Sequence, residues 1–581
     1  MQGQGQGQGQ EEQRREQDQE WELGDDDYEL TVMSLEELAE NRNRMRPDPH
    51  KDQILAVCWC IHEMGGRPGK PPRSKGVIAV DEDGGGGWRL GMPVGCDCVI
   101  VDSERRLFEE LELLVVRRDP DILVGFECQL RSWGYLLQRA VFLSPPLNFD
   151  RGLSRCPSHR SSLEARDDKY GQDHASGLKV CGRELLNVWR LCRSEVKLPM
   201  YTYAMVCAKV INKREPEYAP ETLTAWYTGR TAAQRSAAAA GVGRPVGGGV
   251  AAGTQRSGRL RRRAIMHVLS RAVNTLELVD TMDMIGRTCE LARVFGIDFI
   301  SVVTRGSQYR VESMMYRLAR TQNYALISAS SEQVQSQGPI SCIPLVMSPE
   351  SAFYTDPVLV LDFRSLYPSV VIAYNMCYST CVGGDTGSRL GVDAKYSRDP
   401  RLVKAACADG GGFVSPNGVL FLSPKDREGI LPRLLREILE SRVVVKKLMK
   451  RCKEVGDTAT YRKLNARQFG LKLIANVTYG YTSASASGRM PCVSIADSIV
   501  QTGRETLEAA IRMIEDDRSW DAKVVYGDTD SIFVLLKGRT RDQAFRIGKE
   551  ISEKVVFPLF ETHTLLLGPR LSPETVCPSV K

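Results

Sequence analysis

PVLVLDFRSLYPSVVIAYN, residues 357–375, changes its pattern half-way along. The first part is a nearly continuous apolar run that ends on Asp362, which is typical of a buried strand. The second part carries Pro368, which fits the first turn of a helix because an N–H there has no intrahelical partner. The stretch therefore predicts a buried strand that ends on a carboxylate and continues directly into a helix.

Two helices and a hairpin are predicted beyond this stretch. Residues 428–454 place leucines, valines and a methionine at helical spacing with basic residues opposite, which predicts an amphipathic helix about 40 Å long. A second helix is expected from Tyr461 to Thr478, ending near Gly480. KVVYGDTDSIFVLL, residues 523–536, has two β-rich arms around a Gly-Asp turn and predicts a hairpin.

Three acids occupy turn or strand-end positions in these segments. Asp362 ends the apolar strand, while Asp528 and Asp530 lie at the hairpin turn. A carboxylate that ends a buried strand is costly unless a cation compensates it, and a hard divalent ion such as Mg²⁺ commonly does so. Carboxylates from separate segments that share two such ions support phosphoryl transfer. The structural alternative makes Asp528 and Asp530 turn formers and Asp362 a helix cap.

Basic residues recur on single faces of the two predicted helices. Arg442 and Lys446 are four residues apart, and Lys472, Asn476 and Tyr479 fall at i, i+4 and i+7. Such a face beside a magnesium site can hold a triphosphate, because lysine supplies a point charge and arginine binds oxygens bidentately. The alternative is an ordinary solvated surface, which Tyr479 and Gly480 interrupt.

The composition is that of a globular protein with unevenly distributed charge. The 581 residues are 42% hydrophobic, carry a net charge of +6 and begin with a polar Gln/Gly-rich stretch unlike a signal peptide. No apolar run approaches the ~18 residues of a membrane span. Residues 428–490 hold 13 Lys or Arg against 5 Asp or Glu, which indicates a polyanionic partner such as nucleic acid, or else a solvated helix face. The 17 cysteines include no C-x-x-C pair, which favours reduced thiols inside the cell and argues against a zinc or iron–sulfur module.

The rest of the chain combines an α/β pattern with irregular segments. Short apolar runs alternate with helix-like stretches from Tyr28 to about Ala140. Residues 1–27 are a polar, acidic stretch that we expect to be a disordered tail. Residues 230–263, rich in Ala, Gly and Arg, are expected to form a mobile insertion that ends in a basic cluster suited to nuclear import or nucleic-acid binding. The 25 residues from 557 to 581 contain four prolines and no periodicity, so no fold is predicted for them.

Three motifs resemble those of family B DNA polymerases. DFRSLYPS at 362–369, KLIANVTYG at 472–480 and YGDTDS at 526–531 occur in the order and at the spacing of that family. The sequence is more similar to a translesion member than to a replicative one. This resemblance extends from about Tyr28 to Val555, apart from the 230–263 insertion and some loops. The resemblance implies an α/β multidomain fold with an N-terminal and RNase H-like, exonuclease-type region (28–350), a palm in two parts (351–427 and 491–556), helical fingers (428–490) and a divergent tail (557–581).

The resemblance also assigns roles to individual residues. Asp362 and Asp530 would be the main ligands of two Mg²⁺ ions, with the carbonyl of Phe363 as a further ligand and Asp528 as an auxiliary acid. Tyr367 would lie under the deoxyribose and exclude a 2′-hydroxyl. The remaining nucleotide contacts would come from the backbone N–H groups of Ser365 and Leu366, from Arg442, Lys446, Lys472 and Asn476, and, around the base pair, from Leu366 and Tyr479.

The motifs that give family members a proofreading exonuclease are incomplete in this chain. Proofreading members carry Asp-x-Glu, Asn-x-x-x-Phe-Asp and Tyr-x-x-x-Asp. The corresponding segments are SLEEL, FECQLRS and residues 274–278, with Glu36, Glu127, Ser132 and Leu278 at the key positions. Without the full set of carboxylates two metal ions cannot be held, so we expect an exonuclease-like domain that does not proofread.

The resemblance predicts template-directed addition of dNTPs to a primer 3′-hydroxyl in the nucleus, as translesion synthesis. The alternative is a non-catalytic fragment that binds DNA or polymerase subunits, because a thumb and C-terminal cysteine clusters for zinc and iron–sulfur are not recognised after residue 556. The family implies two kinds of accessory partner, a HORMA-domain subunit and small polymerase delta-type subunits. The regions that bind these partners are not recognised in this chain. A metal-dependent nuclease or phosphatase is disfavoured by Tyr367 and the triphosphate-binding helix.

Overall fold

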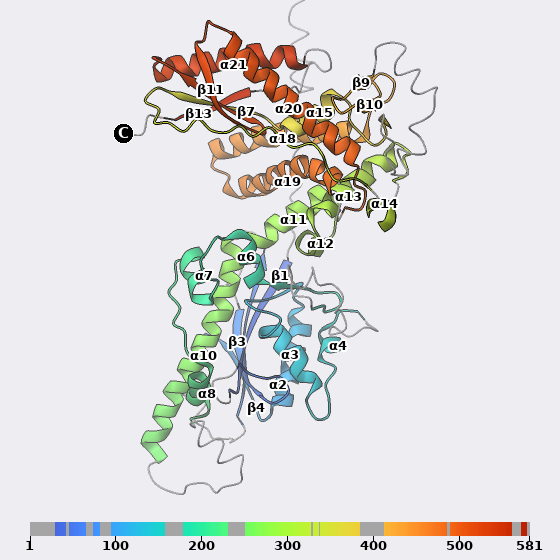
Figure 1. Cartoon of the computed structure of the whole chain (residues 1–581). Helices are drawn as coiled ribbons and strands as arrows, with labels where there is room; N and C mark the ends of the chain where they lie inside the picture. Colours follow the sequence, from blue (N-terminus) through green and yellow to red (C-terminus); the bar gives the residue numbers. More distant parts are fainter. Residues whose placement is uncertain are drawn as a thin grey trace, which may run out of the picture. The chain divides into compact units, whose positions relative to one another are not determined.

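The computed structural model divides the chain into two compact units, Met1–Gly286 and Arg287–Lys581 (Figure 1). It describes residues 30–41, 46–64, 74–81, 95–156, 178–229, 250–326, 329–335, 337–383, 412–484, 488–560 and 571–577. The predicted acidic tail, residues 1–27, lies outside the described residues, as does the first part of the predicted insertion, residues 230–249.

A six-stranded mixed sheet forms the centre of the first unit. Its order is β4-β3-β2-β1-β5-β6, in which β1, β2 and β3 are antiparallel neighbours while β5 is parallel to β1, β6 to β5 and β4 to β3. The strands are β1 (Leu30–Ala39), β2 (Ile54–Met64), β3 (Ser74–Val80), β4 (Asp97–Val101), β5 (Ile122–Gly125) and β6 (Glu184–Asn187).

Helices cover both faces of this sheet, so β1 is buried on both sides. Met33 and Leu35 of β1 pack in one core with residues of the helices α2 and α3, whereas Leu38 packs in a second core with residues of α8 and α10. This follows from the alternation of side chains along a strand. The helices are α2 (Glu104–Arg118), α3 (Ser132–Val141), α4 (Phe149–Leu153), α6 (Val188–Glu195), α7 (Tyr203–Val210), α8 (Pro220–Thr228) and α10 (Val250–Thr281).

The end of the predicted insertion is helical, because α10 already begins at Val250. Two arginines of the basic cluster contact aromatic residues of α8 and the preceding segment. The guanidinium of Arg263 lies 4.7 Å from the ring centre of Trp226, and Nε of Arg261 donates a hydrogen bond to the carbonyl of Tyr227. These contacts anchor residues 258–263 to the fold, which corrects the expectation of a mobile segment through residue 263.

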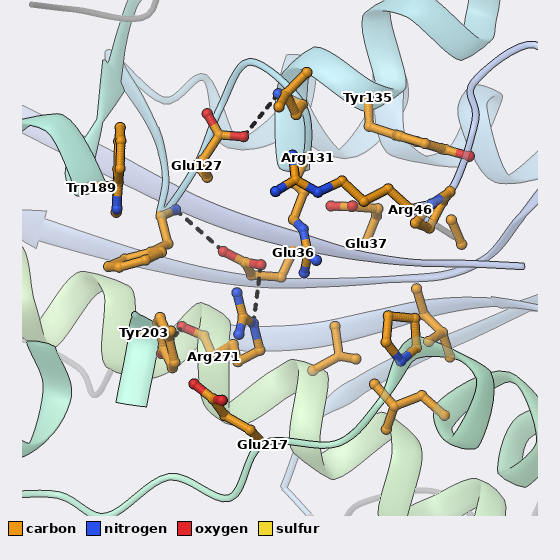
Figure 2. A pocket seen from close by; sticks show the side chains of 18 of the residues that line it. Glu36, Glu37, Arg46, Glu127, Arg131, Tyr135, Trp189, Tyr203, Glu217 and Arg271 are labelled. Atoms are coloured by element: carbon orange, nitrogen blue, oxygen red, sulfur yellow. Dashed lines mark hydrogen bonds and ion pairs between the residues drawn. The ribbon is translucent and has the colours of Figure 1, made fainter. Parts of the chain in front are cut away.

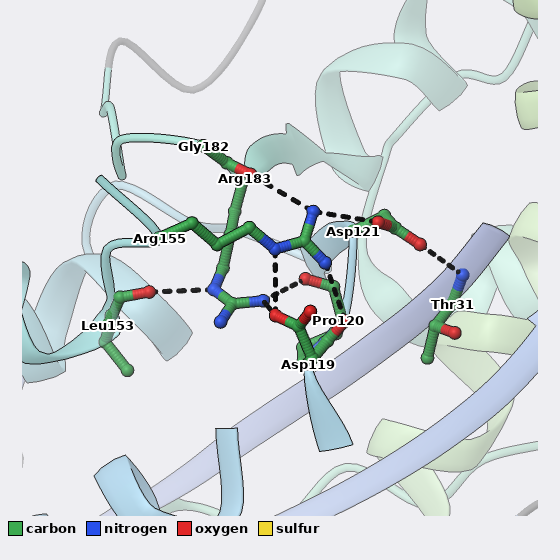
Figure 3. Close-up of polar contacts among 8 residues, drawn as sticks. All are labelled: Thr31, Asp119, Pro120, Asp121, Leu153, Arg155, Gly182 and Arg183. Atoms are coloured by element: carbon green, nitrogen blue, oxygen red, sulfur yellow. Dashed lines mark hydrogen bonds and ion pairs between the residues drawn. The ribbon is translucent and has the colours of Figure 1, made fainter. Parts of the chain in front are cut away.

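A cluster of charged residues joins the end of α2 to the start of β5 and β6 (Figure 3). Asp119, in the left-handed region with φ 42°, accepts from Arg155 Nε and pairs with Arg183 Nη1, both at 2.8 Å. Arg155 also pairs with Asp121, whose other oxygen accepts from the backbone N–H of Thr31. The hydrogen bond from Arg155 lowers the pKa of Asp119. The cluster fixes one end of the sheet.

The second unit is organised around a four-stranded antiparallel sheet in the order β11-β12-β7-β13. Its strands are β7 (Val358–Phe363), β11 (Ala522–Asp528), β12 (Ser531–Leu536) and β13 (Leu571–Cys577). The predicted strand and hairpin are therefore confirmed as neighbours. Two long helices, α20 (Val493–Asp516) and α21 (Arg541–Phe560), pack with this sheet in one large apolar core (Figure 1).

The final residues differ from the expectation that they have no assignable fold. Helix α21 continues to Phe560, and β13 pairs with β7 from Leu571 to Cys577. The pairing partner is distant in sequence, so the local pattern of Pro573 and its neighbours carried no signal for it.

Helices complete the second unit. Strand β7 leads into α15 (Leu366–Ala373), as predicted, and α18 (Ile430–Val455) and α19 (Thr458–Ser483) form a helical hairpin through Gly456 and Asp457. The other elements are α11 (Met284–Phe295), α12 (Phe299–Thr304), α13 (Ser307–Thr321), α14 (Ser331–Gln335), β8 (Cys381–Gly383), β9 (Phe413–Val414) and β10 (Leu420–Phe421). Among the helices described, none is long and apolar enough to cross a bilayer.

Candidate active site

Asp362 and Asp530 meet at the end of the β7–β12 pair. The register places Ser531 opposite Asp362, so Asp530 immediately precedes the residue that faces it. The hydroxyl of Ser531 lies 3.2 Å from Oδ1 of Asp362 and 3.3 Å from Oδ1 of Asp530. The sum of these distances limits the two oxygens to a separation of about 6.5 Å, which two ions about 4 Å apart can bridge. The sequence expectation that these acids converge is confirmed.

The turn that carries Asp528 is held from a neighbouring segment. Thr529 has a left-handed φ of 54°, and its N–H donates to the carbonyl of Leu345 at 2.8 Å. The N–H of Met347 donates in turn to the carbonyl of Gly527. The carboxylate of Asp528 is exposed and accepts from the hydroxyl of Thr529 at 2.9 Å. Its oxygens are thus engaged locally, whereas Asp362 and Asp530 share one hydroxyl.

Four cations lie close enough to affect one another's charge, and one of them follows Asp362 by two residues. Arg442 and Lys446 lie on α18, Lys472 lies on α19 and Arg364 follows β7. Burial and the charge of Arg364 lower the pKa of Arg442. Burial, followed by the charges of Arg442, Arg364 and Lys472, lowers the pKa of Lys446. Within the described chain Arg442, Lys446 and Lys472 form no ion pair with an acid, so the cluster is suited to a polyanion.

Arg364 was not singled out from the sequence. Its position directly after Asp362 and Phe363 could have marked it as a site residue. Its direction toward the cations of α18, however, depends on the turn between the strand and the helix. Ser365 at that turn has φ 54° and caps α15, whose first turn begins at Leu366. The N–H groups there have no intrahelical acceptors. The turn therefore brings Arg364 and the start of α15 to the same end of the sheet.

Tyr367 and Tyr479 form the aromatic wall of the site. Their ring centres are 4.7 Å apart with an interplanar angle of 38°. Tyr367 also lies against α20, because a Cβ on Gly503 would be 3.0 Å from its ring. Burial, the neighbouring Tyr479 and the charges of Asp530 and Asp528 raise the pKa of Tyr367 to about 12. The ring is thus fixed beside the acids and stays neutral.

The other predicted nucleotide contacts are only partly brought together. Asn476 is exposed on α19, one turn beyond Lys472, and Leu366 is buried in the core. The side chain of Phe363 is also buried, which leaves its backbone carbonyl as the group that could act as a ligand.

The donor set of the acid pair suits a hard cation. It consists of carboxylate and hydroxyl oxygens, which Mg²⁺ prefers, and contains no nitrogen or sulfur. Among the described side chains no group of three or more His, Cys, Asp or Glu is arranged to hold a metal ion. The protein therefore offers a two-carboxylate site, which leaves room for substrate oxygens and water as further ligands.

Comparison with known proteins agrees with this geometry. Residues 297–565, which include all the site residues above, match the model of DNA polymerase family B. We call these residues the family B domain, after the family whose model they match. The chain is 42% identical over 552 residues to the human DNA polymerase zeta catalytic subunit and 42% identical over 556 residues to that of Arabidopsis thaliana. The corresponding subunit of Saccharomyces cerevisiae is 40% identical over 540 residues.

The coverage of these comparisons is uneven. The alignments include 90%, 91% and 90% of this chain, but only 16%, 28% and 33% of the human, plant and yeast subunits. The chain thus spans a third or less of the length of these relatives. Both units, and not the family B domain alone, share in the similarity.

The residues linked to proofreading lie in the first unit around a pocket of about 710 Å³ (Figure 2). Glu36 and Glu127 line it. Ser132 is buried and donates to the carbonyl of Leu35 at 2.6 Å, and Leu278 is buried outside the lining. The residue that faces Glu36 from α10 is Arg271, at 3.3 Å. It precedes the segment 274–278 and was not singled out from the sequence. The sequence feature that could have marked Arg271 is its position one helical turn before residue 274 on the same helix.

Proposed function

We propose that the family B domain adds deoxynucleotides to a primer 3′-hydroxyl under the direction of a template. The supporting observation is the Ser531-bridged pair of Asp362 and Asp530 together with a cluster of basic side chains. Three members of that cluster, Arg442, Lys446 and Lys472, form no ion pair with an acid of the described chain. Acids for divalent ions next to cations for a triphosphate are the two halves of a nucleotidyl-transfer site.

Asp362 and Asp530 would hold two Mg²⁺ ions, which supply charge stabilisation to the attacking and leaving oxygens when bound. Arg442, Lys446 and Lys472 bind the triphosphate, and the first-turn N–H groups of α15 donate to its oxygens. Tyr367 occupies the space that a ribose 2′-hydroxyl needs. These groups position the α-phosphate for in-line attack, and no covalent intermediate is required.

We further propose that the first unit is an exonuclease-like domain that does not proofread. Its strand order, with an antiparallel β1–β2–β3 meander and β5 and β6 parallel to β1, supports an RNase H-like assignment. Ser132 and Leu278 supply no carboxylate, and Glu36 is paired with Arg271. Translesion synthesis, nuclear location and association with HORMA-domain and delta-type subunits belong to the same proposal, supported by the similarity to zeta catalytic subunits.

Primer extension with Mg²⁺ and dNTPs tests the proposed synthesis against a DNA-binding role without catalysis. The wild-type chain is expected to extend the primer, whereas Asp530→Ala is not. The Asp150→Ala variant, which removes an acid of the first unit, serves as the control and should extend normally. Equal extension by the wild type and Asp530→Ala would exclude the proposal. Release of nucleotides without dNTPs would instead indicate a nuclease.

A further inference from the structure

One wall of the pocket in the first unit combines a buried acid with a partly buried base. Glu36 is 3% exposed, and its Oε2 lies 3.3 Å from Nε of Arg271 on α10. Its Oε1 accepts from the N–H of Phe126 at 3.3 Å. The guanidinium of Arg271 also stacks on Tyr203, 4.2 Å from the ring centre. Figure 2 shows Arg271 and Glu36 facing each other, with Tyr203 beside the pair. Both charged groups of the pair are thus held in fixed positions.

The side chains around Glu36 do not fit a pair of divalent ions. Ser34 lies two residues before Glu36 on the same face of β1, and its buried hydroxyl has no hydrogen-bond partner among the described residues. Thr275 follows Arg271 by one helical turn and presents a buried hydroxyl rather than an acid. The nearby Ser132 is also a hydroxyl. Of the glutamates that line the pocket, Glu36 is the one paired with Arg271. The described side chains here include no group of three or more His, Cys, Asp or Glu that could hold a metal ion.

A single buried carboxylate still needs a positive charge close to it. Glu37, the next residue, lies on the opposite face of β1, where its Oε2 accepts from the N–H of Ser132. Burial and the charge of Glu36 raise the pKa of Glu37 to about 7. A negative charge on Glu37 beside that of Glu36 is therefore unfavourable. Arg271 is the cation in contact with Glu36.

We propose that Arg271 takes the place of a metal ion in this pocket. Its guanidinium neutralises Glu36, fills the volume that a hydrated divalent cation would need and joins α10 to β1. In this proposal the positive charge beside Glu36 comes from the side chain of Arg271 and not from a bound metal ion. The first unit therefore requires no divalent ion to fold and gives none a place beside Glu36.

The test compares the response of unfolding to Mn²⁺ when the cation on the chain is removed. All variants carry Asp362→Asn and Asp530→Asn, so that ions bound in the family B domain cannot contribute and a failure of the proposed synthesis does not affect the result. Arg271→Met keeps the aliphatic stem against Tyr203 but removes the charge. Arg271→Lys, which keeps a charge, and the double variant Arg271→Met with Glu36→Gln are the matched controls.

Hydrogen exchange of β1 and α10 and the unfolding temperature are measured with and without millimolar Mn²⁺. We expect no response from the parent chain or from Arg271→Lys, a lower unfolding temperature in Arg271→Met that Mn²⁺ restores, and no response in the double variant. A parent chain that Mn²⁺ protects, or an Arg271→Met variant that it does not, would overturn the proposal.

If the Arg271→Met variant does not fold, refolding experiments test the proposal instead. The proposal then requires that refolding succeed when Mn²⁺ is present, and that Glu36→Gln in the same chain allow refolding without it. If both treatments fail, Arg271 supports the fold in a way unrelated to the charge of Glu36, and the proposal is wrong.

Discussion

The hydroxyl of Ser531 lies between the two acids that we propose as metal ligands. Asp362 and Asp530 belong to different strands, and Ser531 is within hydrogen-bond distance of both. A hydroxyl has one proton, so it can donate to one carboxylate at a time, and it lies within reach of both. The arrangement orients two like charges toward one point before any ion arrives.

Replacing Ser531 by Ala should weaken divalent-ion binding. A hydrogen bond to a charged group contributes about 1.5–3 kcal/mol, so the Mg²⁺ concentration for half-maximal extension should rise by about tenfold or more. Titration of extension rate with Mg²⁺ measures this. Ser531→Thr retains the hydroxyl and should stay close to the wild type. An unchanged Mg²⁺ requirement in Ser531→Ala would show that the hydroxyl does not position the acids.

Substitution of Tyr367 should change sugar selection. Its ring is held by Tyr479 and by the close approach of Gly503, so it cannot move aside for a 2′-hydroxyl. Tyr367→Ala should raise ribonucleotide incorporation relative to deoxyribonucleotide by about tenfold to a hundredfold, since a steric contact of this size is worth about 1–3 kcal/mol. Single-nucleotide incorporation with matched rNTP and dNTP measures the ratio. Tyr367→Phe keeps the ring and should keep the selection.

The lowered pKa of Lys446 predicts a pH dependence of nucleotide binding. Burial and the charges of Arg442, Arg364 and Lys472 disfavour the protonated amine, whereas a bound triphosphate favours it. Binding therefore takes up a proton at high pH, and the KM for dNTP should rise as pH increases through the lowered pKa. Lys446→Met should raise the KM at neutral pH by about tenfold and flatten this rise. Lys447→Met, which changes the exposed neighbour, is the control; a wild-type KM that is constant with pH would contradict the argument.

The residues predicted from sequence are those whose chemistry is unusual for their position. Asp362 ends an apolar strand and Asp530 lies at the turn before another, so the local pattern was enough to mark them. Ser531, Arg364 and Arg271 are ordinary in their local context, and their roles depend on strand register, a left-handed turn and a helix face. Those features become visible only when distant segments are placed together.

At the scale of elements, the helical hairpin that carries Lys472 is tied to the helix α11. Glu290 of α11 is 1% exposed and pairs with Arg467 of α19 at 2.5 Å and with Arg293 at 3.6 Å. Gly470, one turn further along α19, allows close packing because a Cβ there would be 2.8 Å from Leu291. This contact sets the position of α19 against the rest of the second unit.

Arg467→Met should destabilise the second unit. It leaves the buried carboxylate of Glu290 with Arg293 alone, and since Arg467 is partly exposed we expect a loss of about 1–3 kcal/mol in the free energy of unfolding. Urea unfolding measures the loss. The double variant Glu290→Gln with Arg467→Met should recover part of it, and Arg462→Met, an exposed change on the same helix, should have little effect. Equal stability of Arg467→Met and the wild type would show that the pair contributes nothing.

Helix boundaries were predicted where the signals are local. The predicted helix 428–454 is observed as Ile430–Val455, ended by Gly456 in the left-handed region. The helix predicted from Tyr461 to Thr478 extends from Thr458 to Ser483, because Asp457 caps its start and Tyr481 and Thr482 are buried at its end. Strand β13 could not be predicted, since it depends on pairing with β7, which is far away in sequence.

At the scale of the whole molecule, each unit has its own core and its own charged site. The acid pair, the basic cluster and the tyrosines all belong to the second unit, which contains the family B domain. The Glu36–Arg271 pair belongs to the first. Synthesis, as we propose it, therefore uses residues of one unit, and in the other unit we propose that Arg271 occupies the place of a metal ion.

The most direct test is the number of Mn²⁺ ions that the chain binds with primer-template and a non-hydrolysable dNTP, counted by electron paramagnetic resonance. The account predicts a pair of ions in the wild type, fewer in Asp362→Asn and in Asp530→Asn, and an unchanged pair in Glu36→Gln. A full pair of ions in either aspartate variant would contradict the claim that these two carboxylates form the metal site.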